Sequence, residues 1–544
     1  MREIKNNMLR INNIQLHLDH TEPELQAAIC EKLAIKNEQL LNYRVYKRSY
    51  DARQKHNIFF IYSLDVATTQ DADLLVQFAQ DAQVKPKPDD RYQLVAQAPK
   101  NLSERPIVIG MGPCGLFAGL ILAQMGFKPI ILERGKAVRE RTVDTFGLWR
   151  KRQLNVESNV QFGEGGAGTF SDGKLYTQIK DPQHHGRKVL QEFVKAGAPE
   201  EILYLSKPHI GTFKLVSMVE KMRATIESLG GEVRFEQRVD DVLIEDQQIQ
   251  GVMLASGETL LSRHVVFAIG HSARDTFKML FAQGVYIEAK PFSIGFRIEH
   301  PQAMIDRCRF GDYAGHELLG AADYKLVHHC KNGRSVYSFC MCPGGTVVAA
   351  TSAEGHIVTN GMSQYSRNER NANSAIVVGI APEQDYPGSP LAGLDLQEKL
   401  EQYAFVAGGS TYDAPAQLVG DFLAKRPSTA LGSVAPSYQP GVKLGDLSAC
   451  LPDYAITAIR EAIPAFDKKI KGFAMQDAVL TAVETRTSSP IRLKRDRDSL
   501  QSINTTGLYP AGEGAGYAGG ILSAAVDGIK IAEAVALDML QNSI

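Results

Sequence analysis

The alternation of apolar and polar residues at the start of the chain predicts a small α+β unit. Residues 9–18, LRINNIQLHL, alternate with the period of a strand, and residues 23–34 repeat apolar positions with the period of a helix. The same pattern gives strands at 40–49 and 57–65, a helix near 69–81 and a strand near 92–96. This β-α-β-β-α-β order is typical of a ferredoxin-like split βαβ unit.

A buried strand, a glycine turn, a helix and a second strand follow a linker at 97–106. The first strand runs into Gly110-x-Gly112-x-x-Gly115, and the second strand ends at Glu133. In such a unit the first glycine permits the turn, the second lets a pyrophosphate approach the backbone, and the third lets helix and strand pack closely. The expected dinucleotide-binding residues are Gly110, Gly112, Pro113, Gly115, Glu133 and Arg134.

Two further features of this unit suit a dinucleotide. The helix N-terminus offers free N–H groups and a partial positive charge to phosphates. Glu133 lies 18 residues after Gly115 (133 − 115 = 18), where an acidic side chain can bind ribose hydroxyl groups. This half of the site does not distinguish NAD from FAD.

A second glycine-rich segment, QFGEGGAGTFSDGKLYT at 161–177, predicts a concave anion site. Closely spaced glycines let consecutive N–H groups point toward a pyrophosphate or the rim of a flavin. The alternative is a flexible surface loop, but Phe162, Phe170 and Leu175 place apolar anchors between the glycines. The candidate contacts are Gly166, Ala167, Gly168, Thr169, Ser171, Asp172, Gly173 and Lys174.

Two later stretches favour FAD through a resemblance. GLYPAGEGAGYAGGILSAAVDG, residues 507–528, resembles the C-terminal strand and helix that hold the ribitol and flavin in the glutathione-reductase superfamily. AIG at 268–270, which ends a strand-rich stretch from 232, resembles the A-T-G of the same superfamily. The resemblance implies that FAD contacts Val239, Ala268, Gly270, Gly512, Glu513, Gly520 and Ile521.

Four segments resemble, more narrowly, a family of FAD-dependent dehydrogenases. They are KRSYDARQK at 47–55, the GEGGAGTFSDGKL loop, FCMCPGG at 339–345 and TRTSSPIR at 485–492, and they span almost the whole chain. The resemblance implies FAD and redox chemistry, and it leaves the substrate and the catalytic residues open. We therefore expect an FAD-dependent oxidoreductase that transfers hydride between the flavin and an organic substrate.

These patterns divide the chain into regions. We expect a small α+β domain at 1–100, an α/β Rossmann-type FAD domain split between 101–285 and 476–544, and an inserted mixed α+β substrate domain at 286–475. The insertion has strand-like stretches such as FSIGFRIEHP and RSVYSFCMC, and its place in the sequence suggests a cover over the flavin. Helices are expected in it near 394–405, 415–424 and 453–471.

Cys340 and Cys342 are two residues apart on a predicted strand, so both side chains should point to one face. Strand rise places their Cα atoms about 6.6 Å apart, near the upper limit for a disulfide. One interpretation is a thiol or thiolate that faces the flavin, with Cys342 as a catalytic candidate. The other is a pair of buried strand cysteines, since cysteine is commonly buried.

Two arginines and two histidines are further candidates for chemistry. Arg486 and Arg492 frame TSSP, where they could grip a carboxylate or phosphate or form an interdomain ion pair. His271 and His300 could donate protons or have structural roles. Arg486 and His271 join Cys342 as the predicted catalytic residues, and no metal site is expected.

The composition is that of a globular protein. Of 544 residues, 44% are hydrophobic and 22% charged, and the net charge of −1 gives no global attraction to nucleic acid or membrane. Seven scattered cysteines without a CxxC suit the reduced thiols of a cytoplasm. MREIKNNMLRINN lacks the apolar core of a secretory signal, and no apolar run approaches the ~20 residues of a membrane span. We expect a cytoplasmic protein that acts on a small molecule.

A basic cluster in the N-terminal unit leaves a second function open. Its members could contact RNA or another anion, or they could form a solvated strand face; they are Arg44, Lys47, Arg48, Arg53 and Lys55. The alternative is therefore a flavoprotein that acts in RNA modification or as a redox-sensing RNA- or protein-binding module. No second G-x-G-x-x-G follows a strand and no CxxxxC is present, so either NAD(P)H acts as a transient electron donor or the electron partner is another molecule.

Overall fold

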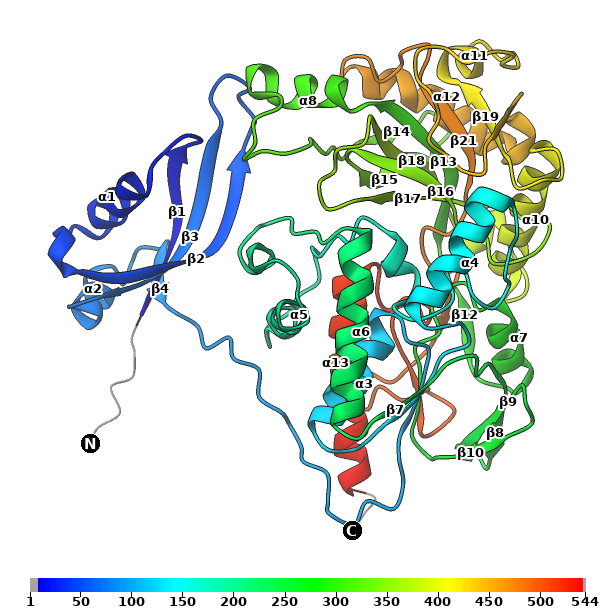
Figure 1. Ribbon diagram of the computed structural model, residues 1–544, viewed down its shortest axis with the longest axis horizontal. Coiled ribbons are helices and arrows are strands. Elements are labelled where there is room, and N and C mark those ends of the chain that lie inside the picture. The colour runs from blue at the N-terminus through cyan, green and yellow to red at the C-terminus, as the bar shows by residue number, and fades with distance from the viewer. Residues whose placement is uncertain (1–7, 542–544) are drawn as a thin grey trace.

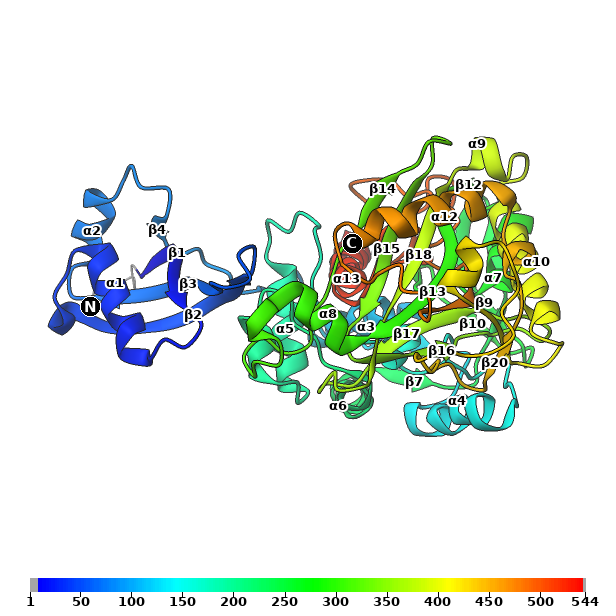
Figure 2. The same cartoon turned by 90° about the horizontal axis from the view of Figure 1, so that it is seen from above.

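The computed structural model describes residues 8–541 (Figure 1). An N-terminal unit stands apart from a larger body, and an extended linker joins the two (Figure 2). The sequence was searched for a secretory signal over residues 1–13. Residues 1–7 of that stretch lie outside the described residues. Within residues 8–541, no helix combines the length and the apolar character needed to cross a membrane.

The N-terminal unit is a four-stranded antiparallel sheet in the order β2-β3-β1-β4. The order of its elements along the chain is the expected one: β1 (Leu9–His17), α1 (Glu22–Leu33), β2 (Leu40–Asp51), β3 (Phe59–Thr68), α2 (Asp71–Gln77) and β4 (Val84–Pro86). The strand expected near 92–96 is wrong. These residues pack on the larger body instead, where the Tyr92 hydroxyl donates to Glu533 at 2.9 Å and the Ala98 N–H to the Met125 carbonyl at 2.8 Å.

A five-stranded parallel sheet in the order β23-β11-β5-β6-β7 forms the centre of the larger body. Its two faces bury alternate residues, so that Val108 and Val266 pack on helices while Ile107 and Val265 pack on a three-stranded sheet. The strands of the parallel sheet are β5 (Ile107–Ile109), β6 (Ile130–Leu132), β7 (Glu232–Arg234), β11 (Val265–Phe267) and β23 (Leu508–Pro510). The helices are α3 (Pro113–Gln124), α5 (His185–Lys195), α6 (Thr212–Ser228) and α13 (Ile521–Gln541), and the three-stranded sheet is β8 (Val239–Glu245), β9 (Gln248–Leu254) and β10 (Thr259–Leu261).

A seven-stranded sheet in the order β14-β15-β18-β13-β21-β19-β20 lies above the parallel sheet (Figure 1). Its strands are β13 (Phe292–Pro301), β14 (Val327–His329), β15 (Ser335–Cys342), β18 (Asn371–Ile380), β19 (Ala414–Leu418), β20 (Val442–Leu444) and β21 (Val479–Glu484). The helices of this region are α8 (Gln302–Phe310), α9 (Pro382–Asp385), α10 (Ala392–Ala407), α11 (Val419–Leu423) and α12 (Asp453–Asp467). Remaining elements are α4 (Val138–Lys151), α7 (Arg274–Ala282) and the strand pairs β12 (Ile287–Ala289) with β22 (Ile491–Leu493) and β16 (Gly345–Ala349) with β17 (Thr359–Ser363).

Two expectations for this region differ from the structure. The helix expected at 415–424 begins as strand β19, because Ala416 and Leu418 pair with β21, and only its second half is the helix α11. Strand β21 lies past residue 475, where the insertion was expected to end, yet it is paired on both sides within the seven-stranded sheet. The chain therefore leaves this sheet only after Glu484.

The N-terminal unit contacts the larger body through strand β2. The Arg48 N–H donates to the Tyr204 carbonyl at 2.6 Å, and the Ser206 N–H donates to the Arg48 carbonyl at 2.9 Å. Farther along β2, the Tyr50 ring meets Phe310 of α8 edge to face. The unit is thus fixed to both the lower and the upper parts of the body.

Candidate functional site

A cavity of about 770 Å³ lies between the parallel sheet and the seven-stranded sheet. Its walls come from the loops after β5 and β11, the glycine loop at 161–178, the segment 512–524 and residues 338–341 of β15. This is the carboxyl end of the parallel strands, where open α/β sheets bind ligands. The predicted residues that line it are Gly110, Gly112, Pro113, Glu133, Arg134, Gly166, Ala167, Gly168, Ser171, Asp172, Gly173, Lys174, Val239, Ala268, Gly270, His271, Arg486, Gly512, Glu513, Gly520 and Ile521.

Three predicted residues, Gly115, Thr169 and Cys342, are not among the lining residues. A Cβ on Gly115 would lie 1.8 Å from the Gly110 carbonyl oxygen, so this glycine serves helix packing, as the motif requires of its third glycine. The Thr169 hydroxyl donates to the Glu164 carbonyl at 3.4 Å, behind the loop. These two residues support the site without facing it.

The glycines bring backbone against backbone around the cavity. Gly110 has a φ of +93°, and a Cβ there would lie 2.5 Å from the Ala268 carbonyl oxygen. A Cβ on Gly166 would lie 2.8 Å from the Gly112 Cα. At Gly270 and Gly520, by contrast, a Cβ would meet no atom within 4 Å. Gly110 and Gly166 therefore pack against neighbouring backbone, whereas Gly270 and Gly520 border open space. This arrangement suits an elongated ligand with a phosphate at the N-terminus of α3.

Glu133 holds this backbone in place. Its carboxylate, in a residue only 4% exposed, accepts the N–H groups of Met111 at 2.8 Å and of Gly135 and Gly163 at 2.9 Å. A carboxylate offers about four lone-pair sites, so one remains for a ribose hydroxyl. The residue therefore has a structural duty that the sequence motif alone does not reveal.

Arg141 of α4 holds the glycine loop in place, a role that the sequence did not predict. Its fully buried guanidinium donates to the carbonyls of Asn159, Val160 and Glu164 at 2.7–2.8 Å. Burial lowers the pKa of Arg141 to about 10. The available signal was an arginine at helical spacing from Val138, Thr145 and Leu148, which share the buried face of α4. The loop is consequently anchored from below, and the alternative of a flexible surface loop is wrong.

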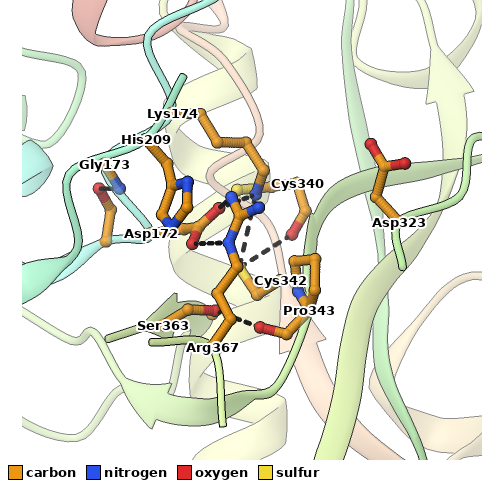
Figure 3. Close-up of polar contacts among 12 residues, drawn as sticks. Asp172, Gly173, Lys174, His209, Asp323, Cys340, Cys342, Pro343, Ser363 and Arg367 are labelled. Carbon is orange, nitrogen blue, oxygen red and sulfur yellow. Dashed lines mark hydrogen bonds and ion pairs between the residues drawn. The ribbon is translucent and has the colours of Figure 1, made fainter. Parts of the chain in front are cut away.

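Asp172 and Lys174 lie in a buried charge cluster at the far end of the loop (Figure 3). The Lys174 ammonium and the Arg367 Nε each lie 3.0 Å from a carboxylate oxygen of Asp172, which is 1% exposed. Burial opposes ionisation, but the charges of Lys174 and Arg367 prevail and hold the pKa of Asp172 below its usual range. These side chains bind one another before any ligand arrives, and two cations share the single carboxylate of Asp172.

Cys340 and Cys342 do not follow the regular strand alternation from which their common face was predicted, although their thiols still share a hydrogen bond. The pairing of β15 with β18 shifts register between Phe339 and Cys342, and Cys340 has a φ of +44°. This bulge breaks the strand alternation. Cys340 lines the cavity, whereas Cys342 is fully buried behind it, with its thiol 3.4 Å from the Cys340 carbonyl oxygen and 3.8 Å from the Lys174 ammonium. The cysteine that faces the cavity is therefore not the one chosen from the sequence.

An ion pair within the seven-stranded sheet supports this bulge. Arg297, fully buried on β13, donates to Glu484 at 2.9 Å and to the Cys340 carbonyl at 2.9 Å. Asn373 and Asn360 accept its remaining Nη contacts at 3.1 Å. Charged residues inside otherwise apolar strands, FSIGFRIEHP and VLTAVE, were the signal for this pair.

Arg486 forms a buried ion pair, which was the structural alternative to binding a substrate carboxylate or phosphate. It binds the fully buried Glu401 of α10 through Nε at 3.0 Å and Nη2 at 2.8 Å. Its Nη1 donates to Ser272 and Ser352 at 2.9 and 2.8 Å, and Arg274 binds Glu401 from the other side at 2.6 Å. The guanidinium is committed to this cluster, so a grip on a substrate anion would need the cluster to open.

His271 and Glu513, both predicted site residues, lie close together in the cavity wall. His271 Nε2 lies 3.9 Å from Glu513 Oε1. Burial, helped by Arg486 and Arg274, lowers the pKa of His271 to about 4, and burial raises the pKa of Glu513 to about 7. His271 is thus neutral at physiological pH and suits a hydrogen-bonding role more than the donation of a proton from an imidazolium.

His300 and Arg492 lie outside the lining of the cavity. His300 is fully buried beside Phe473, whose carbonyl accepts a hydrogen bond from its Nε2 at 2.8 Å. Arg492 lies 3.6 Å from Glu288, and its guanidinium lies over the Tyr517 ring. Both side chains therefore make structural contacts away from the cavity.

The basic cluster of the N-terminal unit is partly engaged. The Arg48 guanidinium lies over the rings of Phe60 and Tyr204, and Arg53 is bound to Asp51. These contacts use two of the five cations that were considered for RNA. Nothing in residues 8–541 favours the nucleic-acid alternative.

The comparisons with known proteins agree with a flavin protein. Residues 291–487 match a family model described as "FAD-dependent protein, C-terminal domain-like", and residues 8–67 match a domain of unknown function. An "Uncharacterized protein" of Clostridium beijerinckii (strain ATCC 51743 / NCIMB 8052) is 49% identical over 526 residues, which are 96% of this chain and 98% of that protein. The chain belongs to the family of this clostridial protein.

The solved structures that resemble this chain have low sequence identity to it. A triple mutant of a flavin-dependent brominase is 13% identical with a TM-score of 0.37, covering 80% of this chain and 81% of its own. L-proline dehydrogenase from P. horikoshii is 13% identical with a TM-score of 0.33, covering 79% and 92%. Scores this low carry no argument about substrate or mechanism.

Proposed function

We propose that this protein is an FAD-dependent oxidoreductase whose FAD lies along the cavity. The observation that carries the proposal is that one cavity joins the Gly110 loop, the 161–178 loop and the segment 512–521, the three stretches expected to bind FAD. The family match of residues 291–487 supports the same cofactor. When bound, FAD would supply the exchange of a hydride with an organic substrate.

The chain would hold the two ends of the cofactor with different groups. At the adenosine end, Glu133 has one lone pair free for ribose, and Val239 lines the wall where an adenine would rest. The N-terminus of α3, at Gly112, would face the pyrophosphate. At the flavin end, Glu513 and the first turn of α13 would contact the ribitol and the ring.

The substrate would enter where the cavity meets the seven-stranded sheet. Tyr176, Tyr324 and Lys325 line this part, and Lys207 binds Asp323 at 2.6 Å across it. A pair of opposite charges at an entrance can orient a polar substrate and can exchange partners with it. Arg486 would act here as a positioning residue, since it fixes Ser272 and, with Arg274, Glu401 beside the cavity.

The test is an anaerobic absorbance titration of the purified holoprotein with NADH and with NADPH. Bleaching of the flavin band by one coenzyme supports a reductase half-reaction with that coenzyme as transient donor. Bleaching by neither, in protein that carries flavin, assigns the reducing role to the organic substrate and excludes NAD(P)H. A protein that neither contains nor takes up flavin would overturn the proposal.

A further inference from the structure

The two cysteines of the β15 bulge sit among more cations than anions. Lys174, Arg297 and Arg367 approach them from three different segments, and Asp172 and Glu484 are the carboxylates that pair with these cations. Asp323 lies beside the cluster (Figure 3), but it is bound to Lys207 at 2.6 Å. Burial raises the pKa of Glu484, which weakens the negative side further. With both thiols protonated, this buried cluster carries at least one unbalanced positive charge. Ionisation of one thiol would balance it.

The cluster distinguishes the two sulfurs. A hydrogen bond from the Cys342 thiol, with the charges of Lys174 and Arg297, holds the pKa of Cys340 below its usual range. The same hydrogen bond, together with burial, raises the pKa of Cys342. A thiolate next to a thiol is the arrangement from which a disulfide forms by loss of one proton and two electrons.

The position of the pair connects it to the proposed flavin. Cys340 lines the cavity that Glu513 and Gly520 line from the other side, and a negative charge on Cys340 contributes to the raised pKa of Glu513. Cys342 lies behind Cys340 and within reach of its main chain. The bulge thus places Cys340 at the cavity and Cys342 directly behind it.

Three of the other five cysteines lack this arrangement. Burial, together with a nearby carboxylate, raises the pKa of Cys330 to about 11 and of Cys450 to about 12. Cys114 lies under Gly512, where burial also raises its pKa. Buried neutral thiols of this kind are inert.

We infer that Cys340 and Cys342 are a redox-active pair that exchanges two electrons with the flavin, an inference that rests on the proposed function. The Cys340 thiolate and the Cys342 thiol form an S–S bond, and the Cys342 proton and two electrons pass to oxidised FAD, giving its reduced anion. The total charge of −1 is the same before and after. In the reverse direction the reduced flavin opens the disulfide, and Lys174 stabilises the Cys340 thiolate that results.

The experiment counts electrons in the purified holoprotein. The protein is oxidised with ferricyanide, freed of it, and titrated anaerobically with dithionite while the flavin absorbance is followed. The wild type should consume twice as much reductant per FAD as Cys340→Ser and Cys342→Ser, because a disulfide takes up a second electron pair. Cys450→Ser, a buried cysteine remote from the cavity, should behave like the wild type.

A second measurement follows the bond itself. Anaerobic illumination with EDTA delivers electrons through the flavin, and alkylation with mass spectrometry then reports the state of the peptide that carries both cysteines. The expected result is a disulfide in the oxidised protein that becomes two alkylated thiols as the flavin is reduced. Two results would overturn this inference and leave the proposed function intact. In one, the flavin bleaches while the alkylation state of Cys340 and Cys342 does not change. In the other, the wild type consumes no more reductant than the variants. Absence of flavin would overturn the proposed function as well.

Discussion

Glu401 binds Arg486 through both carboxylate oxygens, at 3.0 and 2.8 Å, and the side chains of Arg486 and Glu401 are only 5% and 0% exposed. The contact ties helix α10 to the chain segment that returns from the seven-stranded sheet to the cavity. Arg274 of α7 completes the cluster from the parallel-sheet side. A single carboxylate therefore joins the two sheets that enclose the cavity.

Loss of this carboxylate should destabilise the protein strongly. Glu401→Gln leaves Arg274 and Arg486 buried without a counter-charge, and breaking a buried ion pair in this way costs about 3–5 kcal/mol. The free energy of unfolding in urea, followed by the fluorescence of Trp149, the single tryptophan, measures the change. Glu398→Gln on the same helix removes only an exposed contact to Lys278 and should cost about 1 kcal/mol or less. Equal losses in the two variants would contradict this role for Glu401.

Gly112→Ala should weaken FAD binding and leave the fold intact. The φ of Gly112 is −72°, and its new Cβ would approach the protein no closer than 3.7 Å, so the methyl group fits the protein but occupies the path of the pyrophosphate. We expect at least a tenfold higher dissociation constant, about 1.4 kcal/mol, measured by fluorescence titration of apoprotein with FAD. Gly445→Ala, remote from the cavity and equally free of clashes, is the matched control. Unchanged affinity in Gly112→Ala would place the phosphates elsewhere.

Glu513 should make the apoprotein less stable as the pH rises from about 4.5 to about 7. Its pKa is raised from 4.5 to about 7, so the folded state holds this proton more tightly than the unfolded state and loses that advantage as the carboxyl ionises. Glu513→Gln should match the wild type near pH 4.5 and exceed it at pH 8 by up to about 3 kcal/mol. The lowered pKa of His271 acts in the opposite direction but is shared by both proteins. Urea unfolding of both proteins across this pH range measures the difference in their free energies of unfolding. A difference that does not change with pH would contradict the prediction.

Arg48→Ala should loosen the N-terminal unit from the body. The substitution removes a guanidinium that lies 5.4 Å from the centre of the Tyr204 ring, at the point where β2 exchanges backbone hydrogen bonds with residues 204–206. Hydrogen exchange at the Arg48 and Ser206 amides should then accelerate about tenfold, the effect of about 1.4 kcal/mol on local opening. Arg44→Ala changes an exposed cation of the same strand and should leave both amides as they were. Equal protection in the two variants would show that the guanidinium contributes nothing to docking.

The sequence predicts the local units of this fold well because their signals are local. The turn at Gly110, the helix that begins at Pro113 and the acid at Glu133 lie within one short stretch, and spacing alone identifies them. The strand expected near 92–96 fails for the opposite reason. Tyr92 finds its partner Glu533 at the far end of the chain, and no local pattern encodes that contact.

The candidate site divides in the same way. The glycines that line the cavity follow from motifs, whereas the roles of Arg486 and Cys342 depend on partners from distant segments, Glu401 and Lys174. Strand alternation placed Cys340 and Cys342 alike, whereas only Cys340 lines the cavity, because the bulge at Cys340 depends on Arg297 beneath it and leaves no mark in the periodicity. The sequence pattern does not predict such long-range ion pairs.

FAD binding in the cavity between the two sheets determines which chromophore the purified chain carries and how much of it. Protein purified in the dark is denatured by heat, and the released compound is identified by mass and quantified against the chain. The account predicts FAD at one molecule per chain, with Gly112→Ala depleted and Gly445→Ala fully loaded. A colourless protein that takes up no FAD on prolonged dialysis would contradict it.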